Sequence, residues 1–112
     1  MKTIKKIRRT KMSEQGGRCY YCDLPMWDDA EVPFGKGNGK AAPHLLRCTA
    51  EHLQARSDGG KDTFDNIVAA CWFCNTRRHN QKVPLEPEAY RQHVRRRMSA
   101  GRWLAGKFAN RR

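Results

Sequence analysis

Two cysteine pairs frame the residues of this chain that could do chemistry. In each pair two residues separate the cysteines, Cys19 from Cys22 and Cys71 from Cys74. Two such pairs are the usual ligand pattern of a tetrahedral zinc site, because each turns the chain tightly enough for both sulfurs to reach one ion. We expect a structural Zn²⁺ here, with reduced, unligated thiols as the alternative. The fifth cysteine, Cys48, lies between apolar residues and is expected to be a small buried side chain.

Between the pairs, and just after the second, lie side chains that suit a second, reactive centre. Neutral imidazole accepts a proton at physiological pH, so His52 is the candidate general base, with a structural core histidine as the alternative. Glu51, Asn75 and His79 are candidate ligands of a catalytic divalent ion. The side-chain oxygens of Glu51 and Asn75 suit Mg²⁺ or Mn²⁺, whereas the imidazole of His79 favours a transition metal such as Ni²⁺. His79 also fits a phosphate contact or a helix cap.

The expected secondary structure sets a condition on this centre. Asn75 and His79 are four residues apart on a predicted helix, and therefore share one face. Glu51 and His52 are adjacent on a predicted strand, so their side chains point to opposite faces. They can serve one phosphate only if the strand ends or bulges at this point.

The order and spacing of these residues closely resemble those of the HNH endonuclease family, over about residues 18–82. The matching elements are Cys19/Cys22, Glu51-His52, Gly59-Gly60, Asp65-Asn66-Ile67 and Cys71/Cys74-Asn75. Position 51 is Glu, where many members carry Asp or His. The resemblance implies a ββα-metal core that hydrolyses DNA with one catalytic divalent ion and a histidine base. It also implies that Asn75 is an ion ligand and that Asn66 holds the loop that carries the base.

Charge is concentrated at the two ends of the chain. Residues 1–18 hold seven Lys/Arg against one Glu, a balance of +6, and residues 84–112 hold eight against two, again +6. Residues 19–83 hold eight of each sign. Basic arms around a neutral centre are typical of proteins that bind nucleic acid, although a solvated basic surface is the alternative. The predicted phosphate contacts are Lys61, Arg77, Arg78, Lys82, Arg95, Arg96 and Arg97.

Composition narrows the remaining possibilities. The chain begins Met-Lys-Thr-Ile-Lys-Lys, without the apolar stretch of a signal peptide, and has no apolar run long enough to span a bilayer. Together with zinc-type cysteine spacing, this favours a reducing, cytoplasmic location. We expect DNA as the partner and neither a membrane nor a small-molecule substrate. Oligomeric state, target sequence and biological pathway stay open.

The expected fold is a small α+β domain, in which a zinc-stapled ββα-metal core lies between basic helices. Three segments are predicted: a basic N-terminal helix or arm over 1–17, the core over 18–83 and a basic helical extension over 84–112. The core should contain a strand over 45–53, a short strand or extended segment over 64–70 and a helix over 74–82. The outer helices are expected at 2–15, leaning on the domain, and at 87–99. A long loop is expected over 23–43, and a docked helix or frayed tail over 101–112.

One rival interpretation is a non-catalytic zinc module that only binds nucleic acid. It accounts for the cysteines and the basic arms. It gives no reason for Glu51-His52, Asn66 and Asn75, so we favour the nuclease.

Overall fold

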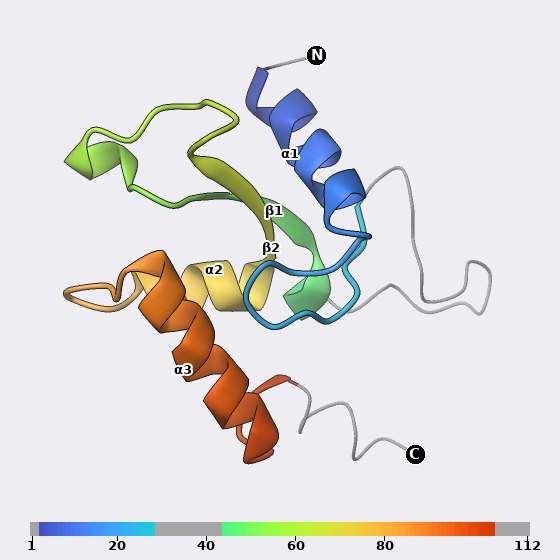
Figure 1. The fold of residues 1–112 in the computed structure, drawn as a ribbon, viewed down its shortest axis with the longest axis vertical. Helices are drawn as coiled ribbons and strands as arrows, with labels where there is room; N and C mark the ends of the chain where they lie inside the picture. Colours follow the sequence, from blue (N-terminus) through green and yellow to red (C-terminus); the bar gives the residue numbers. More distant parts are fainter. Residues whose placement is uncertain (1–2, 29–43, 105–112) are drawn as a thin grey trace.

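The computed structural model describes residues 3–28 and 44–104, and within them a small α+β fold (Figure 1). The predicted fold class is confirmed. The parts of the expected 23–43 loop and of the expected C-terminal segment that fall on 29–43 and 105–112 lie outside the described residues. The described elements are α1 (Thr3–Glu14), the 3₁₀ turn η1 (His44–Leu46), β1 (Cys48–His52), the 3₁₀ turn η2 (Arg56–Asp58), β2 (Ile67–Cys71), α2 (Trp72–His79) and α3 (Pro87–Ser99).

The two strands form an antiparallel hairpin at the centre of the molecule. Their register runs without a bulge from Cys48 opposite Cys71 to His52 opposite Ile67. Every residue of β2 is buried, which agrees with its apolar sequence Ile-Val-Ala-Ala-Cys. Both α1 and α2 pack against the hairpin, so β2 is covered by protein on both of its faces.

The second cysteine pair joins β2 to α2 without an intervening loop. Cys71 ends β2 and is also the N-cap of α2, where its sulfur accepts a hydrogen bond from the backbone N–H of Cys74. α2 therefore begins two residues before the predicted start at 74, and it ends at His79 rather than 82. α3 spans Pro87–Ser99, as predicted, and begins with the proline that favours a first helical turn.

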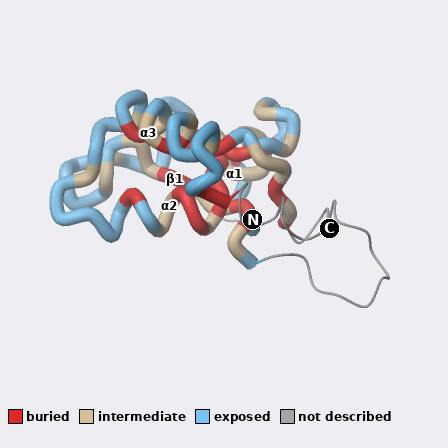
Figure 2. The backbone as a smooth tube through the Cα atoms, turned by 90° about the horizontal axis from the view of Figure 1, so that it is seen from below, coloured by how far each residue is buried: buried red, intermediate tan, exposed pale blue. Residues whose placement is uncertain are grey.

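The core is built around the cysteines and draws residues from all three predicted segments. Figure 2 shows buried residues gathered around the hairpin and the start of α2, and exposed residues along the outer turns. Met12 of α1 and Val94 of α3 belong to the same core cluster as the cysteines. The first helix was expected to pack on the outside of the domain without contributing to the core. It does contribute, because Met12 belongs to the core cluster. Within the described residues, no helix has the length and apolar character needed to cross a bilayer.

One side chain organises the loop between the strands. Asn66 accepts from the backbone N–H of Gln54 through Oδ1 (2.8 Å), and through Nδ2 it donates to the carbonyls of Gln54 and Lys61 (3.0 Å each). The loop also needs a glycine, because a Cβ built on Gly60 would lie 1.8 Å from the carbonyl oxygen of Gln54.

We expect Gly60→Ala to displace this loop and destabilise the protein. The added methyl group meets backbone rather than a flexible side chain, and such overpacking typically costs about 1–3 kcal/mol. Ser57→Ala, at an exposed position of the same loop, is the control and should leave the free energy of unfolding unchanged. Denaturant unfolding measures both variants, and equal stability of the two would contradict this account of the loop.

Candidate active site

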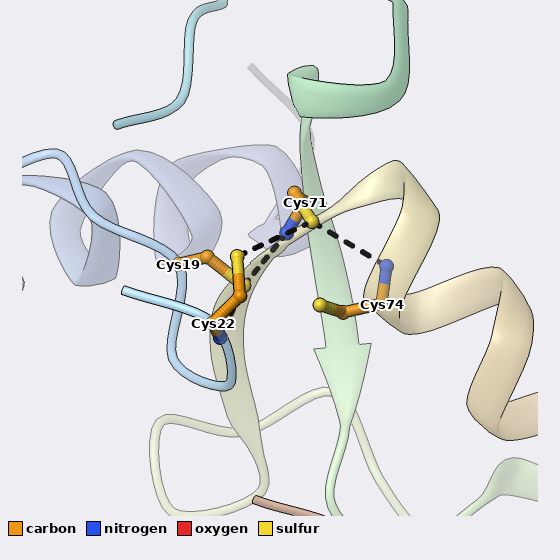
Figure 3. A group of neighbouring side chains, drawn as sticks. All are labelled: Cys19, Cys22, Cys71 and Cys74. Atoms are coloured by element: carbon orange, nitrogen blue, oxygen red, sulfur yellow. Dashed lines mark hydrogen bonds between the residues drawn. The ribbon is translucent and has the colours of Figure 1, made fainter. Parts of the chain in front are cut away.

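The four predicted zinc ligands meet at one buried point (Figure 3). The sulfurs of Cys19, Cys22, Cys71 and Cys74 all lie within 4.8 Å of one another, and none is in a disulfide. A tetrahedral zinc ion with Zn–S bonds of about 2.3 Å places its sulfurs about 3.8 Å apart. The distance between the sulfurs of Cys22 and Cys71 is 3.9 Å. This donor set fits a structural zinc ion.

Donors around the sulfurs support the same conclusion. The backbone N–H of Cys71 donates to the sulfur of Cys19 (3.3 Å), and the indole N–H of Trp103 donates to the sulfur of Cys74 (3.3 Å). Such donors stabilise metal-bound thiolates. Burial raises the pKa of Cys74, so a nearby cation is needed for all four thiols to ionise together. Outside the cluster, burial raises the pKa of Cys48 to about 11, which agrees with the neutral buried thiol that we expected.

Glu51 is a buried carboxylate with three polar partners. It is 1% exposed. Its Oε2 accepts from the hydroxyl of Tyr21 (2.8 Å) and from Nη1 of Arg78 (2.9 Å), and its Oε1 lies 2.7 Å from Nε2 of His79. These partners compensate the cost of burying the charge. They also fix the orientation of the carboxylate, with Oε1 directed to the C-terminal end of α2.

Strand and helix spacing explain why β1 and α2 meet side chain to side chain. Two residues along a strand span about 6.7 Å, and four residues along a helix span about 6 Å. Thr49 and Glu51 of β1 therefore align with Asn75 and His79 of α2. The amide of Asn75 donates to Oγ1 of Thr49 (3.0 Å) and to the carbonyl of Ala50 (3.3 Å), one helical turn before the contact between His79 and Glu51.

Glu51 and His79 supply donor atoms of the kinds that bind a divalent ion, and in this structure these two atoms contact each other at hydrogen-bond distance. Their facing atoms are 2.7 Å apart, and the His79 side chain is 34% exposed, so the pair lies at the edge of the solvent. One carboxylate oxygen and one imidazole nitrogen suit Mn²⁺ or a transition metal, and Mg²⁺ commonly completes its shell with water and phosphate oxygens. Asn75 lies on the same face of α2, with its amide nitrogen directed to β1. The assignment of these three residues as ligands stays a prediction.

His52 points away from Glu51 and contacts the loop between the strands. β1 ends at His52 without a bulge, so of the two alternatives raised by the sequence the strand end applies. Nε2 of His52 lies 2.7 Å from Oδ1 of Asp62, and Nη2 of Arg56 contacts both oxygens of Asp62 (3.1 and 3.0 Å). The hydrogen bond with His52, followed by the Arg56 guanidinium, lowers the pKa of the Asp62 carboxyl.

This contact indicates the tautomer of His52. An ionised carboxylate carries no proton, so a distance of 2.7 Å requires the proton on Nε2. Nε of Arg56 lies 3.3 Å from the same nitrogen. Both contacts cannot be hydrogen bonds to one neutral nitrogen, and we assign the proton to the shorter contact, with the charged partner. Nδ1 is then the proton acceptor of the neutral ring.

Several of these partners could not be identified from the sequence pattern. Asp62 and Arg56 are charged loop residues, which usually indicate only a solvated surface, and nothing in the sequence pattern indicates that Tyr21 contacts Glu51. Arg78 was predicted to contact phosphate. Instead it is 5% exposed, and its guanidinium donates to Glu51 and to the carbonyls of His52, Leu53 and Leu85, so it is occupied within the fold.

The other predicted phosphate contacts divide into two groups. Arg95 is partly buried and donates to the carbonyl of Tyr21, a structural contact that its position within the Arg95-Arg96-Arg97 run did not reveal. The remaining predicted contacts lie at exposed positions: Lys61, Arg77, Lys82, Arg96 and Arg97.

Comparison with known proteins identifies the central part of the chain. Residues 36–81 match the family model described as HNH endonuclease. The match spans the hairpin and α2 with the residues from Glu51 to His79, and it begins after the first cysteine pair. Residues 36–81 are therefore similar to the HNH endonuclease family, and the predicted resemblance is confirmed. No curated protein matches the chain. The domain indicates a nuclease or a related function on nucleic acid.

Replacing one zinc ligand should unfold the protein. In Cys71→Ser we expect loss of bound zinc and of the cooperative thermal transition, because metal binding and folding are coupled in small zinc domains. Cys48→Ser is the matched control, since Cys48 is buried but lies outside the sulfur cluster. Elemental analysis and calorimetry measure both variants. A cooperative transition near that of the wild type in zinc-free Cys71→Ser would refute the structural role.

Removing Asp62 should change the tautomer of His52. In the neutral ring of the wild type the proton should be on Nε2, which faces the Asp62 carboxylate. Asp62→Ala should give a mixture of the two tautomers, and Asp58→Ala, an exposed carboxylate in the same loop, should not. Ring ¹⁵N chemical shifts distinguish the tautomers. An unchanged spectrum in Asp62→Ala would show that this carboxylate does not orient His52.

Proposed function

We propose that this protein is a metal-dependent endonuclease that hydrolyses DNA phosphodiester bonds. One observation carries the proposal: the HNH match covers a strand end and a helix that bring together a buried carboxylate and an imidazole, next to a second, oriented imidazole. Glu51 and His79 are adjacent across β1 and α2, and His52 is held by Asp62 where β1 ends.

His52 is the general base of the proposed reaction. Its Nδ1 takes a proton from the attacking water, while Nε2 keeps its proton in the hydrogen bond to Asp62. Arg56 fixes Asp62 from the other side through both carboxylate oxygens. Asn66 contributes indirectly, because it ties both ends of the loop that carries Arg56 and Asp62.

Glu51 and His79, with Asn75 on the same helical face, are the proposed ligands of the catalytic ion. Mg²⁺ or Mn²⁺ is expected, and the imidazole also admits Ni²⁺ or another transition metal. When bound, this ion stabilises negative charge on the phosphate and on the departing oxygen. Tyr21 and Arg78 hold Oε2 of Glu51, so Oε1 is the proposed oxygen for the ion, which would replace its present contact with Nε2 of His79.

The proposed DNA contacts follow the basic surface. Lys61 lies next to Asp62 in the loop between β1 and β2. The other exposed basic residues lie on or near α2 and α3: Arg77, Lys82, Arg96 and Arg97. Phosphate contacts of this kind give affinity without sequence preference. The cytoplasmic location expected from the sequence suits this substrate.

A zinc module that binds nucleic acid without cutting it is the rival function. The zinc site and the basic surface are equally necessary for that rival. The contact between Glu51 and His79 favours the nuclease, because binding DNA alone does not require an ordered pair of carboxylate and imidazole at the edge of the solvent.

A metal titration of two histidine variants tests the mechanism. His52→Ala should lower plasmid cleavage by about 10²–10⁴-fold, the usual contribution of general-base catalysis, and added Mn²⁺ should not restore it. His79→Ala should also cut slowly, but excess Mn²⁺ should recover part of the rate, because that variant has a weakened ion site. His44→Ala is the control, since His44 lies against Trp72, outside the site, and it should cut as the wild type does.

Zinc content and melting temperature should be the same in His52→Ala as in the wild type. If His52→Ala cuts plasmid as fast as the wild type, the proposed mechanism is wrong. If the wild type binds DNA but cuts none with Mg²⁺, Mn²⁺ or Ni²⁺, the binding module takes its place.

A further inference from the structure

A groove lies between α2 and α3, on the side of α2 that faces away from the proposed active site. Its volume is about 560 Å³. Phe73 and Arg77, four residues apart, line it from α2. Asn75 and His79 each follow one of these residues by two positions, which rotates their side chains by about 200° around the helix axis. The groove is therefore separate from the centre formed by Glu51, His52 and His79.

The floor of the groove is aromatic and rigid, and its exposed apolar surface comes from the chain between the helices. Phe73 and Trp103 pack edge to face, with ring centroids 5.2 Å apart, and both are nearly buried. Val83 and Leu85 also line the groove and are 84% and 45% exposed. Apolar side chains exposed to this degree beside a groove commonly mark a binding site.

The charged lining of the groove is entirely basic. Arg77, Arg97 and Arg102 line it, and no Asp or Glu is among the lining residues within 3–28 and 44–104. The guanidinium of Arg77 lies 4.5 Å from the centre of the Phe73 ring, so an aromatic face supports it. Guanidinium groups bind phosphate oxygens through paired hydrogen bonds. The ligand of such a groove should therefore carry both phosphate and an apolar, flat group.

We propose that this groove binds an unpaired nucleotide of single-stranded nucleic acid. The base lies against Val83 and Leu85, and the flanking phosphates contact Arg77, Arg97 and Arg102. Proteins that bind single strands combine a basic groove with side chains that cover the bases, and in this groove the exposed apolar side chains are aliphatic. A base within a duplex is stacked on both faces and cannot use the apolar surface, so the groove should discriminate single strands from duplexes.

The size of the groove favours a nucleotide over a protein partner. Ligand sites of about 300–1,000 Å³ are typical for small ligands, whereas a stable protein interface buries about 800 Å² on each side. The inference deepens the proposed function, because it assumes that nucleic acid is the substrate. Binding can nevertheless be measured without cleavage, so the two proposals fail independently.

The test compares single-strand and duplex binding in a variant that changes no charge. Fluorescence anisotropy with a labelled oligo-dT strand, and with a duplex of equal length, is measured without added divalent ion. The double variant Val83→Ser/Leu85→Ser should bind the single strand about fivefold or more weakly, because both substitutions remove apolar surface that the base would cover. Its duplex affinity should be unchanged. Phe64→Ser is the matched control, because Phe64 is 47% exposed but lies in the loop between the strands.

A second variant tests the basic lining. Arg97→Gln/Arg102→Gln should weaken single-strand binding and reduce its dependence on salt, by up to about 1.4 in log–log slope if both residues contact phosphate. Equal single-strand affinity in the Val83→Ser/Leu85→Ser variant and the Phe64→Ser control would overturn the proposal, and so would an equal loss of duplex binding.

A labelled peptide of alternating Glu and Leu tests the rival occupant. If this peptide binds the wild type, is released by Val83→Ser/Leu85→Ser, and oligo-dT binding is unaffected by that variant, the groove is a protein docking site and our proposal is wrong. If single-strand binding behaves as expected but plasmid is never cut, the groove assignment stands and the proposed nuclease activity fails.

Discussion

The meeting of four sulfurs at one buried point is the constraint on which this structure depends. It joins the first cysteine pair, just after α1, to the junction of β2 and α2. Because Cys71 is at once a strand residue, a helix cap and a candidate ligand, the cluster fixes the angle at which α2 leaves the hairpin. A domain of this size has a small core, and a zinc ion among the four sulfurs would supply stability that apolar burial alone does not.

Two parts of the chain connect the sulfur cluster to the proposed active site: the first cysteine pair and α2. Tyr21, within the first cysteine pair, donates to the buried carboxylate of Glu51. α2 carries ligands for both proposed ions, with Cys71 and Cys74 at its start and His79 at its end. Five residues of helix separate Cys74 from His79, about 7.5 Å along the axis, so a shift of the cluster would move the position of His79. The structural ion and the proposed catalytic ion are thus linked through rigid elements rather than loops.

Much of this arrangement could be predicted because it depends on local spacing. The cysteine pairs, a strand through Glu51 and His52, and the shared face of Asn75 and His79 follow from residue order and from helix and strand periodicity, whereas the strand end at His52 was one of two open alternatives. The bonds made by Asn66 agree with its predicted role in holding the loop, although its part in catalysis stays a prediction.

Interactions between segments distant in sequence could not be predicted. Arg78 resembles any exposed cation of a basic helix, yet its partners lie on β1 and on the chain before α3. Asp62 reaches His52 only because the loop folds back over the strand end. The packing of Met12 depends on the turn after α1, where Gly16 and Gly17 adopt positive φ angles of 66° and 77° that bring the first cysteine pair against the hairpin.

Anomalous diffraction from crystals soaked in Mn²⁺ tests the central claim most directly. Two separate metal positions are expected on α2. At the zinc absorption edge a peak should lie among the four cysteine sulfurs. A manganese peak should lie within bonding distance of Oε1 of Glu51 and Nε2 of His79, with both residues keeping the positions described here. A manganese peak only at the cysteines, or none beside Glu51 and His79 at saturating Mn²⁺, would contradict the account of a zinc-held frame that carries a second, catalytic ion.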